Sequence, residues 1–416
     1  MEWSRNKENR WENSKCEVMK ILFLLLQMPS EKKEGGMYVD LAAEFKNNGH
    51  DITLMAPDNN YKSNCVREER NMKVVRVASR QTQGVSNMIK KGIALATISY
   101  FYKRAYKKYL SHEQFDLVLM PTPPITLTNF VLYVKRKTKA KFYLILRDIH
   151  PQSIASIGIL KNKVMYRYLD VLAKKCYKYA DYIGCMSEGN ISFIKKNNPS
   201  IEHSKILLLY NWISDNKRTS TDIGQNIRKL YGLNDKVVVL YGGNLGVGQK
   251  IENIVKLAEH CLNNEKVRFV VIGKGIELQR LQTIIEKKNL TNVLFIDFMP
   301  QSDYLEFVSS VDIGLVSINE KYKVPTCPSK AVSYMALGIP VFAIINPNND
   351  YGTIIENAGA GYWVVGNDDN NMYMLFDKLI GNRELRNQMG GNGRKFYEKN
   401  CTTQVAYKTI IKQLAK

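Results

Sequence analysis

A chain of 416 residues is too long for one hydrophobic core and indicates two domains of roughly 200 residues each. Hydrophobic residues make up 45% of it and charged residues 24%, which excludes an intrinsically disordered protein. The net charge of +21 implies an anionic partner, and it is uneven: residues 19–210 carry 31 Lys and Arg against 15 Asp and Glu, whereas residues 211–416 carry 25 against 20. Charge alone leaves both a nucleic acid and an acidic membrane surface open.

The start of the chain carries no sign of a secretory signal. The apolar run 21–26 is far shorter than the roughly 20 residues that span a bilayer, and no small-residue cleavage site follows it. Residues 1–18 have no apolar periodicity, and we expect a loose extension there. The seven cysteines form no CxxC pair, so we expect reduced thiols in a cytoplasmic protein.

The first half alternates predicted strands and helices, which is typical of a parallel sheet covered on both faces. Continuous apolar segments predict the strands, and helical periodicity predicts the helices. The strands are expected at 21–26, 51–55, 74–77, 117–120, 142–146 and 182–185, and the helices at 37–48, 86–110, 125–138, 162–180 and 188–197.

The predicted helix 86–110 is basic and amphipathic. An apolar stripe runs along it at helical spacing, and five Lys or Arg side chains flank that stripe. Two interpretations are open: the stripe contacts an anionic membrane surface, or it faces the core of an ordinary helix with a solvated basic side. The stripe consists of Ile89, Ile93, Ala96, Tyr100 and Lys103.

The second half repeats the same alternation after a polar linker with a short helix at 214–236. Strands are predicted at 237–241, 268–272, 293–296, 313–316 and 341–344, and the segment 369–416 is helical by pattern. Two doubly wound α/β domains in succession predict a ligand site in a cleft between them. We expect domains at 19–210 and 211–395, with a C-terminal helix at 396–416 packing back on the first domain.

Glycine-rich loops follow strands in both halves. Four glycines lie in residues 242–248, and shorter glycine turns stand at 273–275 and 35–36. Such loops let the backbone approach a phosphate closely, and a helix N-terminus beyond them adds unpaired N–H groups. The alternative for the 242–248 loop is a plain turn between strand and helix.

The segment 324–340 is the most specific in the chain. Pro328 ends a loop, and Ser329 is expected to cap a helix whose first turn holds Lys330. The helix N-terminus and one ammonium group together suit a diphosphate.

At these residues the sequence resembles the family 4 retaining glycosyltransferases of the GT-B fold. Within that family it is most similar to the surface-polysaccharide branch that includes N-acetyl-L-fucosamine transferases. The matching segments, in chain order from about Met19, are GG…GH-I-T at 35–53, RDIHPQ at 147–152, NWI at 211–213, YGGNLG at 241–246, VIGKG at 271–275 and PSKAVSYMALGIPV at 328–341.

The resemblance implies two Rossmann-like domains that face a central cleft. It implies transfer of an N-acetylated or deoxy hexose, with retention, from a nucleoside-diphosphate donor, most often UDP-linked. The implied acceptor is a glycan or a polyprenyl-diphosphate-linked sugar in capsule, O-antigen or exopolysaccharide synthesis. Neither a metal nor another cofactor is expected. The expected location is the inner face of the plasma membrane, reached through the basic first domain, with no nucleic acid as partner.

Site residues are carried over from the matching motifs. Asp148 and His150 are expected on the acceptor side and Lys330 at the leaving diphosphate, and these three are the predicted catalytic residues. The predicted donor-binding residues are Gly35, Gly36, Gly243, Asn244, Gln249, Lys250, Gly273, Lys274, Met299, Pro328, Ser329 and Ser333.

Several positions depart from the family pattern. Ser333 and Pro325 occupy the places of an acidic pair whose second member binds the nucleotide ribose in many members. Asn244 and Gln249 stand where an Arg and a Lys commonly contact the diphosphate, so the positive charge must come from Lys250 or Lys330.

Two other functions remain as alternatives. A UDP-N-acetylglucosamine 2-epimerase uses the same fold and also binds a sugar nucleotide in the cleft, but it needs no acceptor. A nucleic-acid-binding protein would suit the charge, but the sequence contains no recognisable nucleic-acid-binding module.

Overall fold

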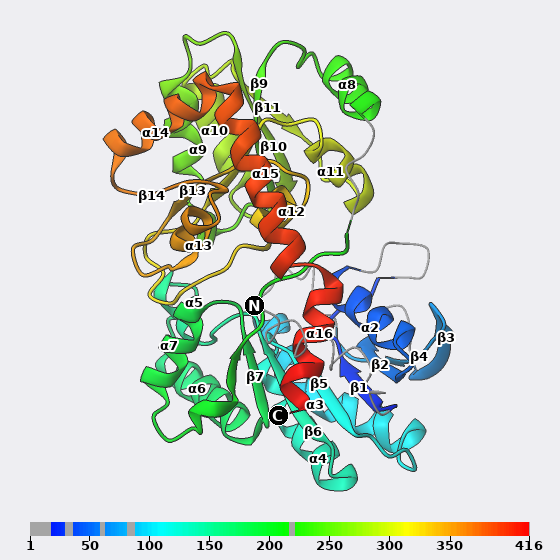
Figure 1. Cartoon of the computed structure of the whole chain (residues 1–416). Helices are drawn as coiled ribbons and strands as arrows, with labels where there is room; N and C mark the ends of the chain where they lie inside the picture. The colour runs from blue at the N-terminus through cyan, green and yellow to red at the C-terminus, as the bar shows by residue number, and fades with distance from the viewer. Residues whose placement is uncertain (1–17, 30–35, 59–62, 81–87, 216–220, 416) are drawn as a thin grey trace, which may run out of the picture.

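The computed structural model describes residues 18–29, 36–58, 63–80, 88–215 and 221–415. Two α/β domains lie one above the other in Figure 1, the N-terminal domain below and the C-terminal domain above. Each domain is built around its own mainly parallel sheet, so the prediction of two doubly wound domains is confirmed.

The N-terminal sheet has eight strands in the order β3-β4-β2-β1-β5-β6-β7-β8. Every neighbouring pair is parallel except β3, which runs antiparallel to β4 at the edge. The strands are β1 (Lys20–Leu24), β2 (Asp51–Pro57), β3 (Cys65–Glu69), β4 (Met72–Val77), β5 (Leu117–Pro121), β6 (Lys141–Leu146), β7 (Tyr182–Cys185) and β8 (Ile206–Leu208).

Helices cover both faces of this sheet, so its central strands are apolar on both sides. Leu22 and Leu24 of β1 point to the face covered by α3, α4 and α6, whereas Ile21 and Phe23 point to the face covered by α2 and the C-terminal helix. The helices are α2 (Met37–Asn47), α3 (Met88–Tyr109), α4 (Thr128–Thr138), α5 (Gln152–Ser156), α6 (Lys163–Tyr179) and α7 (Glu188–Asn197).

The C-terminal sheet has six parallel strands in the order β11-β10-β9-β12-β13-β14. They are β9 (Val237–Asn244), β10 (Val267–Lys274), β11 (Val293–Ile296), β12 (Ile313–Ser317), β13 (Val341–Ile345) and β14 (Gly361–Val365). The helices of this half are α8 (Thr221–Leu230), α9 (Glu252–His260), α10 (Leu278–Lys287), α11 (Gln301–Val308), α12 (Ser329–Ala336), α13 (Tyr351–Asn357), α14 (Asp369–Gly381), α15 (Arg383–Asn400) and α16 (Thr403–Leu414).

The chain crosses between the domains twice, and the two crossings lie side by side. Ile213 on the first crossing forms an isolated parallel bridge with Thr402 on the second, and its N–H donates to the carbonyl of Cys401 at 3.0 Å. In Figure 1 the red helices α15 and α16 follow this path from the upper domain to the lower one.

Helix α16 packs on the N-terminal domain through apolar contacts and a few buried polar ones. Ile410 belongs to the same core cluster as β1, and the Tyr407 hydroxyl lies 3.1 Å from Nε2 of His50. Gln413 accepts a hydrogen bond from the Tyr143 hydroxyl at 2.5 Å. These contacts tie the end of the chain to its first strands.

Within the described ranges, no helix is both long enough and apolar enough to cross a bilayer. The basic helix α3 is partly buried through a face different from the predicted stripe. Its buried side carries Ala94, Ile98, Tyr102, Ala105 and Tyr106, the last four of which belong to the core cluster. The members of the predicted stripe whose side chains are described are exposed and do not face the core.

Candidate active site in the interdomain cleft

A cavity of about 500 Å³ lies between the two domains. Its N-terminal wall is formed by the segments that follow the carboxyl ends of β1, β5, β6 and β7, where ligands of parallel sheets gather. Gly36 and Tyr38 at the start of α2 line the same wall, and Cys327 and Ser329 close it from the C-terminal domain.

Arg147 and Asp148 line the cavity directly after β6. The guanidinium carbon of Arg147 lies 5.4 Å from the ring centre of Trp212, and its Nη1 is buried without a hydrogen-bond partner among the described residues. Asp148 is exposed to the cavity. The wall therefore presents one permanent cation and one accessible carboxylate. Sequence reasoning left Arg147 out of the site, although it stands beside Asp148 in the RDIHPQ motif.

His150 lies two residues further on and does not line the cavity. Its Nδ1 is 2.9 Å from the hydroxyl of Ser153. Burial lowers the pKa of the ring, and the nearby carboxylate of Asp148 opposes this shift by raising the pKa. Because burial is the larger effect, the imidazole is neutral near pH 7. Its contact with Ser153 holds the start of α5 in position.

The glycine turns of the C-terminal domain pack against each other. Gly243 has φ 112°, a left-handed conformation that favours glycine. A Cβ on Gly273 would lie 1.9 Å from the carbonyl oxygen of Gly243, and one on Gly275 would lie 2.1 Å from that of Leu245. The glycines at the ends of β9 and β10 are thus required for this close backbone packing, in which the carbonyl oxygen of Gly243 takes part. Gly243 is nevertheless exposed to solvent.

Lys330 enters this loop from the first turn of α12. Its Nζ is enclosed, lies 3.7 Å from the ring centre of Tyr241, and has no hydrogen-bond partner among the described residues. The Nζ is 3.9 Å from where a Cβ of Gly243 would stand. Burial lowers the pKa of Lys330 to about 7. An enclosed ammonium group without a partner is costly, and a bound anion would offset that cost.

The N-terminus of α12 differs from the prediction in one respect. Ser329 is the first helical residue and Pro328 the capping position, and no side chain caps the helix. Because Ser329 already lies in the first turn, it is not the cap that the sequence predicted, and it is exposed in the cavity wall. Among the described residues no side chain accepts from the first N–H groups of α12, which suits an anionic ligand. Ser333, one turn further, is half-buried.

Lys250 is engaged by a carboxylate. Its ammonium contacts Glu320, and this hydrogen bond lowers the pKa of Glu320 although burial raises it. The second carboxylate oxygen of Glu320 is buried and has no partner among the described residues. Gln249 lies 3.3 Å from the hydroxyl of Tyr241, and Asn244 is exposed at the end of β9.

Lys274 and Phe298 form a second feature near the carboxyl ends of β10 and β11. The Nζ of Lys274 lies 4.1 Å from the centre of the Phe298 ring, which is 61% exposed. Met299 is half-buried and packs at the edge of a core cluster. An exposed aromatic ring beside a cation is a surface on which a nucleobase can stack. Phe298 was not among the predicted residues.

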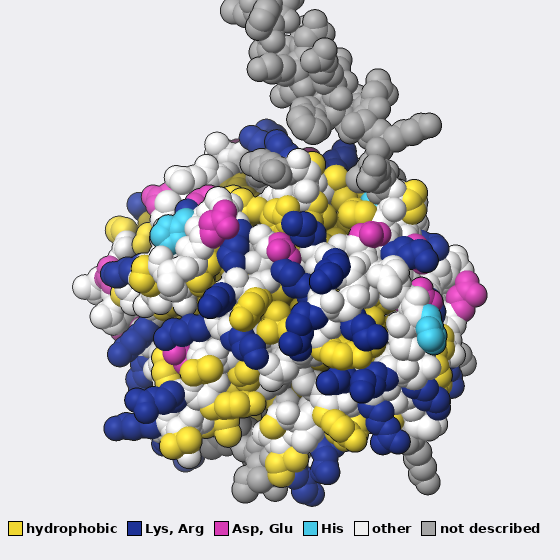
Figure 2. Space-filling view, turned by 90° about the horizontal axis from the view of Figure 1, so that it is seen from below, with side chains coloured by type: hydrophobic (Ala, Val, Ile, Leu, Met, Phe, Trp, Pro, Cys, Tyr) yellow, Lys and Arg dark blue, Asp and Glu magenta, His cyan; other side chains and the backbone are white. Residues whose placement is uncertain are grey.

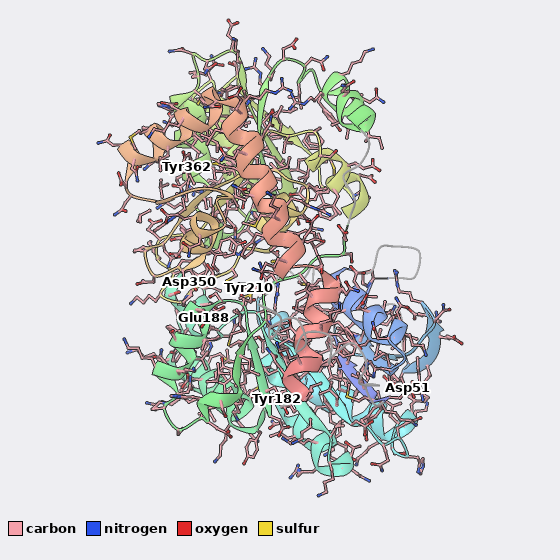
Figure 3. The ribbon with its side chains drawn as sticks, viewed as in Figure 1. Asp51, Tyr182, Glu188, Tyr210, Asp350 and Tyr362 are labelled. Atoms are coloured by element: carbon pink, nitrogen blue, oxygen red, sulfur yellow. The ribbon has the colours of Figure 1, made fainter. Side chains whose placement is uncertain are left out.

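The structure thus brings Gly36, Asp148 and Ser329 into one cavity and places Lys330 beside Gly243. Gly35 lies outside the described residues. Domain contacts beside the cavity fix the two halves: Asp350 accepts hydrogen bonds from the Ser187 hydroxyl at 2.8 Å and from the N–H of Gly189 at 2.6 Å. Figure 3 shows Asp350 close to Glu188 and Tyr210 at this junction.

A larger cavity of about 900 Å³ lies at the amino ends of β9, β12 and β13, the end of the C-terminal sheet opposite the glycine loop. Two of its arginines are committed to the fold: Arg228 donates to the carbonyl of Ser310 and to Asp312, and Arg386 donates to the carbonyl of Leu379.

Comparison with known proteins gives a family match for part of the chain. Residues 224–396 match the family described as "Glycosyl transferases group 1". The matched segment runs from α8 to α15 of the C-terminal domain. The glycine loop, Lys330 and the whole of α12 lie inside this match, so the predicted donor residues of this half stand in the part of the chain that carries the family signal.

Several proteins that the chain is similar to are also glycosyltransferases. The chain is 24% identical over 299 residues to a probable glycosyltransferase WbjE of Pseudomonas aeruginosa. The aligned region covers 70% of this chain and 72% of that protein. The structure of HepE of Anabaena in complex with UDP and glucose superposes with a TM-score of 0.69 at 14% identity, over 95% of this chain and 99% of HepE.

A further solved structure is WaaG, a glycosyltransferase involved in lipopolysaccharide biosynthesis. It has a TM-score of 0.65 at 13% identity and covers 94% of this chain and 98% of WaaG. Likeness at this identity shows the fold, and the predicted GT-B architecture is confirmed.

Proposed function

We propose that the protein transfers a sugar from a nucleoside-diphosphate donor, UDP-linked, to a lipid-linked or glycan acceptor, with retention of anomeric configuration. The observation that carries this proposal is Lys330. An enclosed ammonium without a hydrogen-bond partner is costly, and an anion bound at Gly243 and at the N-terminus of α12 would offset that cost.

The donor diphosphate is proposed to lie between the backbone of Gly243 and the first turn of α12. There Lys330 neutralises the negative charge that develops on the leaving diphosphate, which is where a transferase lowers its barrier most. The base would stack near Phe298, and Lys274 beside it adds a second positive charge. Metal-independent transfer is part of the proposal, because the protein's own cations take this role.

The acceptor is proposed to enter from the N-terminal wall of the cavity. Asp148 would accept a hydrogen bond from the attacking hydroxyl and orient it. Arg147 carries a permanent charge on the same wall, and its unpartnered Nη1 would bind the diphosphate of the donor or of a lipid-linked acceptor.

The class of product rests on the similar proteins. WaaG acts in lipopolysaccharide biosynthesis, HepE binds UDP and glucose, and a 27% identical stretch of 104 residues, 25% of either chain, matches a putative colanic acid biosynthesis transferase of Escherichia coli. These matches support a role in surface-polysaccharide synthesis, in capsule, O-antigen or exopolysaccharide. The motif resemblance to N-acetyl-L-fucosamine transferases supports an N-acetylated or deoxy hexose as the sugar.

The missing acidic pair leaves the ribose without its usual carboxylate. Ser333 offers a hydroxyl in that place, which is a weaker acceptor than a carboxylate. Glu320, whose one carboxylate oxygen contacts Lys250, has a second oxygen that is buried without a partner among the described residues. We therefore expect donor affinity to depend mainly on the diphosphate contacts.

The test is a melting experiment with UDP, GDP and dTDP, followed by donor and acceptor panels. We expect UDP to raise Tm and Lys330→Met to abolish the shift, whereas the matched control Lys266→Met, at the far end of β10, keeps it. Nucleotide release that requires a polyprenyl-diphosphate-sugar acceptor then supports transfer. Release without any acceptor would instead identify an epimerase-like or hydrolytic enzyme, and absence of any nucleotide-induced shift would refute the proposal.

A further inference from the structure

The outer surface of the N-terminal domain is strongly basic. Helices α3, α4 and α6 together contain fourteen Lys and Arg residues and one acidic residue, Asp170. That carboxylate is already occupied, because Lys174 lies 2.7 Å from it and Gln152 donates to it at 2.9 Å. Figure 2 shows this end of the molecule, where Lys and Arg side chains alternate with hydrophobic ones and acidic side chains are few.

Helix α6 exposes a stripe of apolar side chains to solvent. Val164 is 80% exposed and Val171 is 58% exposed, and Tyr168 lies exposed between them on the same helical face. Continuing at helical spacing, this stripe reaches Lys175 and Tyr179. Large exposed aliphatic side chains in a row are unusual on a surface that meets only water.

Helix α3 carries a matching stripe. Ile93 is exposed, and Tyr100, two turns further along the helix, is 63% exposed. The next residue on this face is Lys103. This is the stripe that the sequence singled out, and its described members point away from the core.

The two stripes meet at an open cavity of about 660 Å³. Helix α4, which contacts both α3 and α6, forms its floor with Tyr133 and Arg136. Lys103 and Lys175 line it from either side. The cavity is lined by five Lys or Arg residues and no acidic residue, and within the described part of the chain only Lys135 of these five is paired with a carboxylate.

We propose that this three-helix surface binds an anionic membrane, with the phosphate of an anionic lipid headgroup in the cavity of Lys103 and Lys175. The apolar stripes would enter the boundary between headgroups and acyl chains, while the flanking cations contact the headgroups. Aliphatic side chains such as Val164 favour a bilayer over a nucleic acid, which offers no apolar depth for them. The surface lies outside the cleft and goes beyond the transfer reaction, although it would hold the enzyme next to a lipid-linked acceptor.

The test is sedimentation of the full chain with vesicles of phosphatidylcholine alone or with one-third phosphatidylglycerol. We expect binding only to the anionic vesicles, falling as salt rises. The double variant Lys103→Gln with Lys175→Gln should bind about 25-fold more weakly, at about fivefold per charge. The double variant Val164→Asn with Val171→Asn should bind roughly tenfold more weakly.

A matched control neutralises two exposed lysines of the C-terminal domain, Lys266→Gln with Lys287→Gln, and should bind like the unmodified protein. The UDP-induced change in Tm, measured for all variants, shows that each is folded and keeps the cleft intact. It also separates failure of this proposal from failure of the transfer proposal. Equal binding by the cavity variant and the control would overturn the membrane surface. So would binding of a single-stranded oligonucleotide that depends on the cavity lysines while anionic vesicles stay unbound.

Discussion

Lys330 allows a quantitative prediction about proton uptake. Burial lowers the pKa of this residue from 10.5 to about 7. At about 1.4 kcal/mol per pH unit, its charged form is disfavoured by on the order of 5 kcal/mol in the donor-free protein. A bound diphosphate reverses this preference, because it pairs with the ammonium form. Donor binding above pH 7 must therefore take up a proton.

The magnitude follows from the titration. At pH 8 a group with a pKa of about 7 is about 90% neutral, so binding of UDP should take up about 0.9 proton. UDP affinity should fall about tenfold for each pH unit above 7. Calorimetry in two buffers of different ionisation enthalpy measures the uptake directly. In Lys330→Met we expect weaker binding and uptake near zero.

The same shift affects stability, with the sign fixed by linkage. Because the folded-state pKa lies below that of the unfolded chain, the unfolded chain holds more protons between about pH 7 and 10.5, and stability rises with pH in that window. Lys330→Met should remove this slope and stabilise the donor-free protein at pH 7 by about 1 to 4 kcal/mol. Uptake at pH 8 that is near zero in the unmodified protein, or unchanged in the Met variant, would refute the reasoning.

Three further outcomes are expected. Gly273→Ala would place a methyl group 1.9 Å from a backbone oxygen of the neighbouring glycine loop. Thermal melts should therefore show that the free energy of unfolding falls by about 2 kcal/mol or more, and that UDP raises Tm less. The control Gly381→Ala meets open space and should melt like the unmodified protein. Arg147→Gln should lower kcat/KM at least tenfold with Tm unchanged within a few degrees; full activity would remove this residue from the site. Tyr407→Phe loses its contact with His50 and should cost about 1 kcal/mol in denaturant unfolding while UDP affinity stays the same.

Much of the fold was predictable because its central strands are buried on both faces and read as continuous apolar runs. The strands that sequence reasoning missed differ in this respect. Strand β3 is an edge strand with the sequence CVREE, and β8 has only three residues. Strand β14, GYWVV, carried a usable signal in its aromatic and β-branched run after a glycine.

The candidate site was predictable only as far as local motifs reach. Lys330 and Gly243 stand in segments whose glycines and prolines predict the loops and helices around them. The helix start was predicted one residue too late, so Ser329 lies in the first turn and is not the cap. Arg147 was not predicted as a site residue, because its burial without a hydrogen-bond partner depends on contacts such as that with Trp212, which is distant in sequence. Phe298 likewise could not be predicted as a site residue, because its candidate role depends on its contact with Lys274 in the folded structure.

The basic three-helix surface shows the same limit. Periodicity identified the stripe on α3 but could not say whether it faced the core or solvent. The outward stripe of α6 was not recognised at all, since an apolar helical stripe is read as a core face by default. Only the packing of α3, α4 and α6 brings Lys103 and Lys175 to one cavity.

The central claim is sugar transfer in the interdomain cleft, and product analysis tests it most directly. The full chain would be incubated with a UDP-sugar and a polyprenyl-diphosphate-sugar in vesicles, and UDP release and the anomeric configuration of the product followed by proton NMR. We predict one UDP released for each acceptor consumed, with the anomeric configuration of the donor retained in the product. UDP release at the same rate without acceptor, or a product of inverted configuration, would contradict the account.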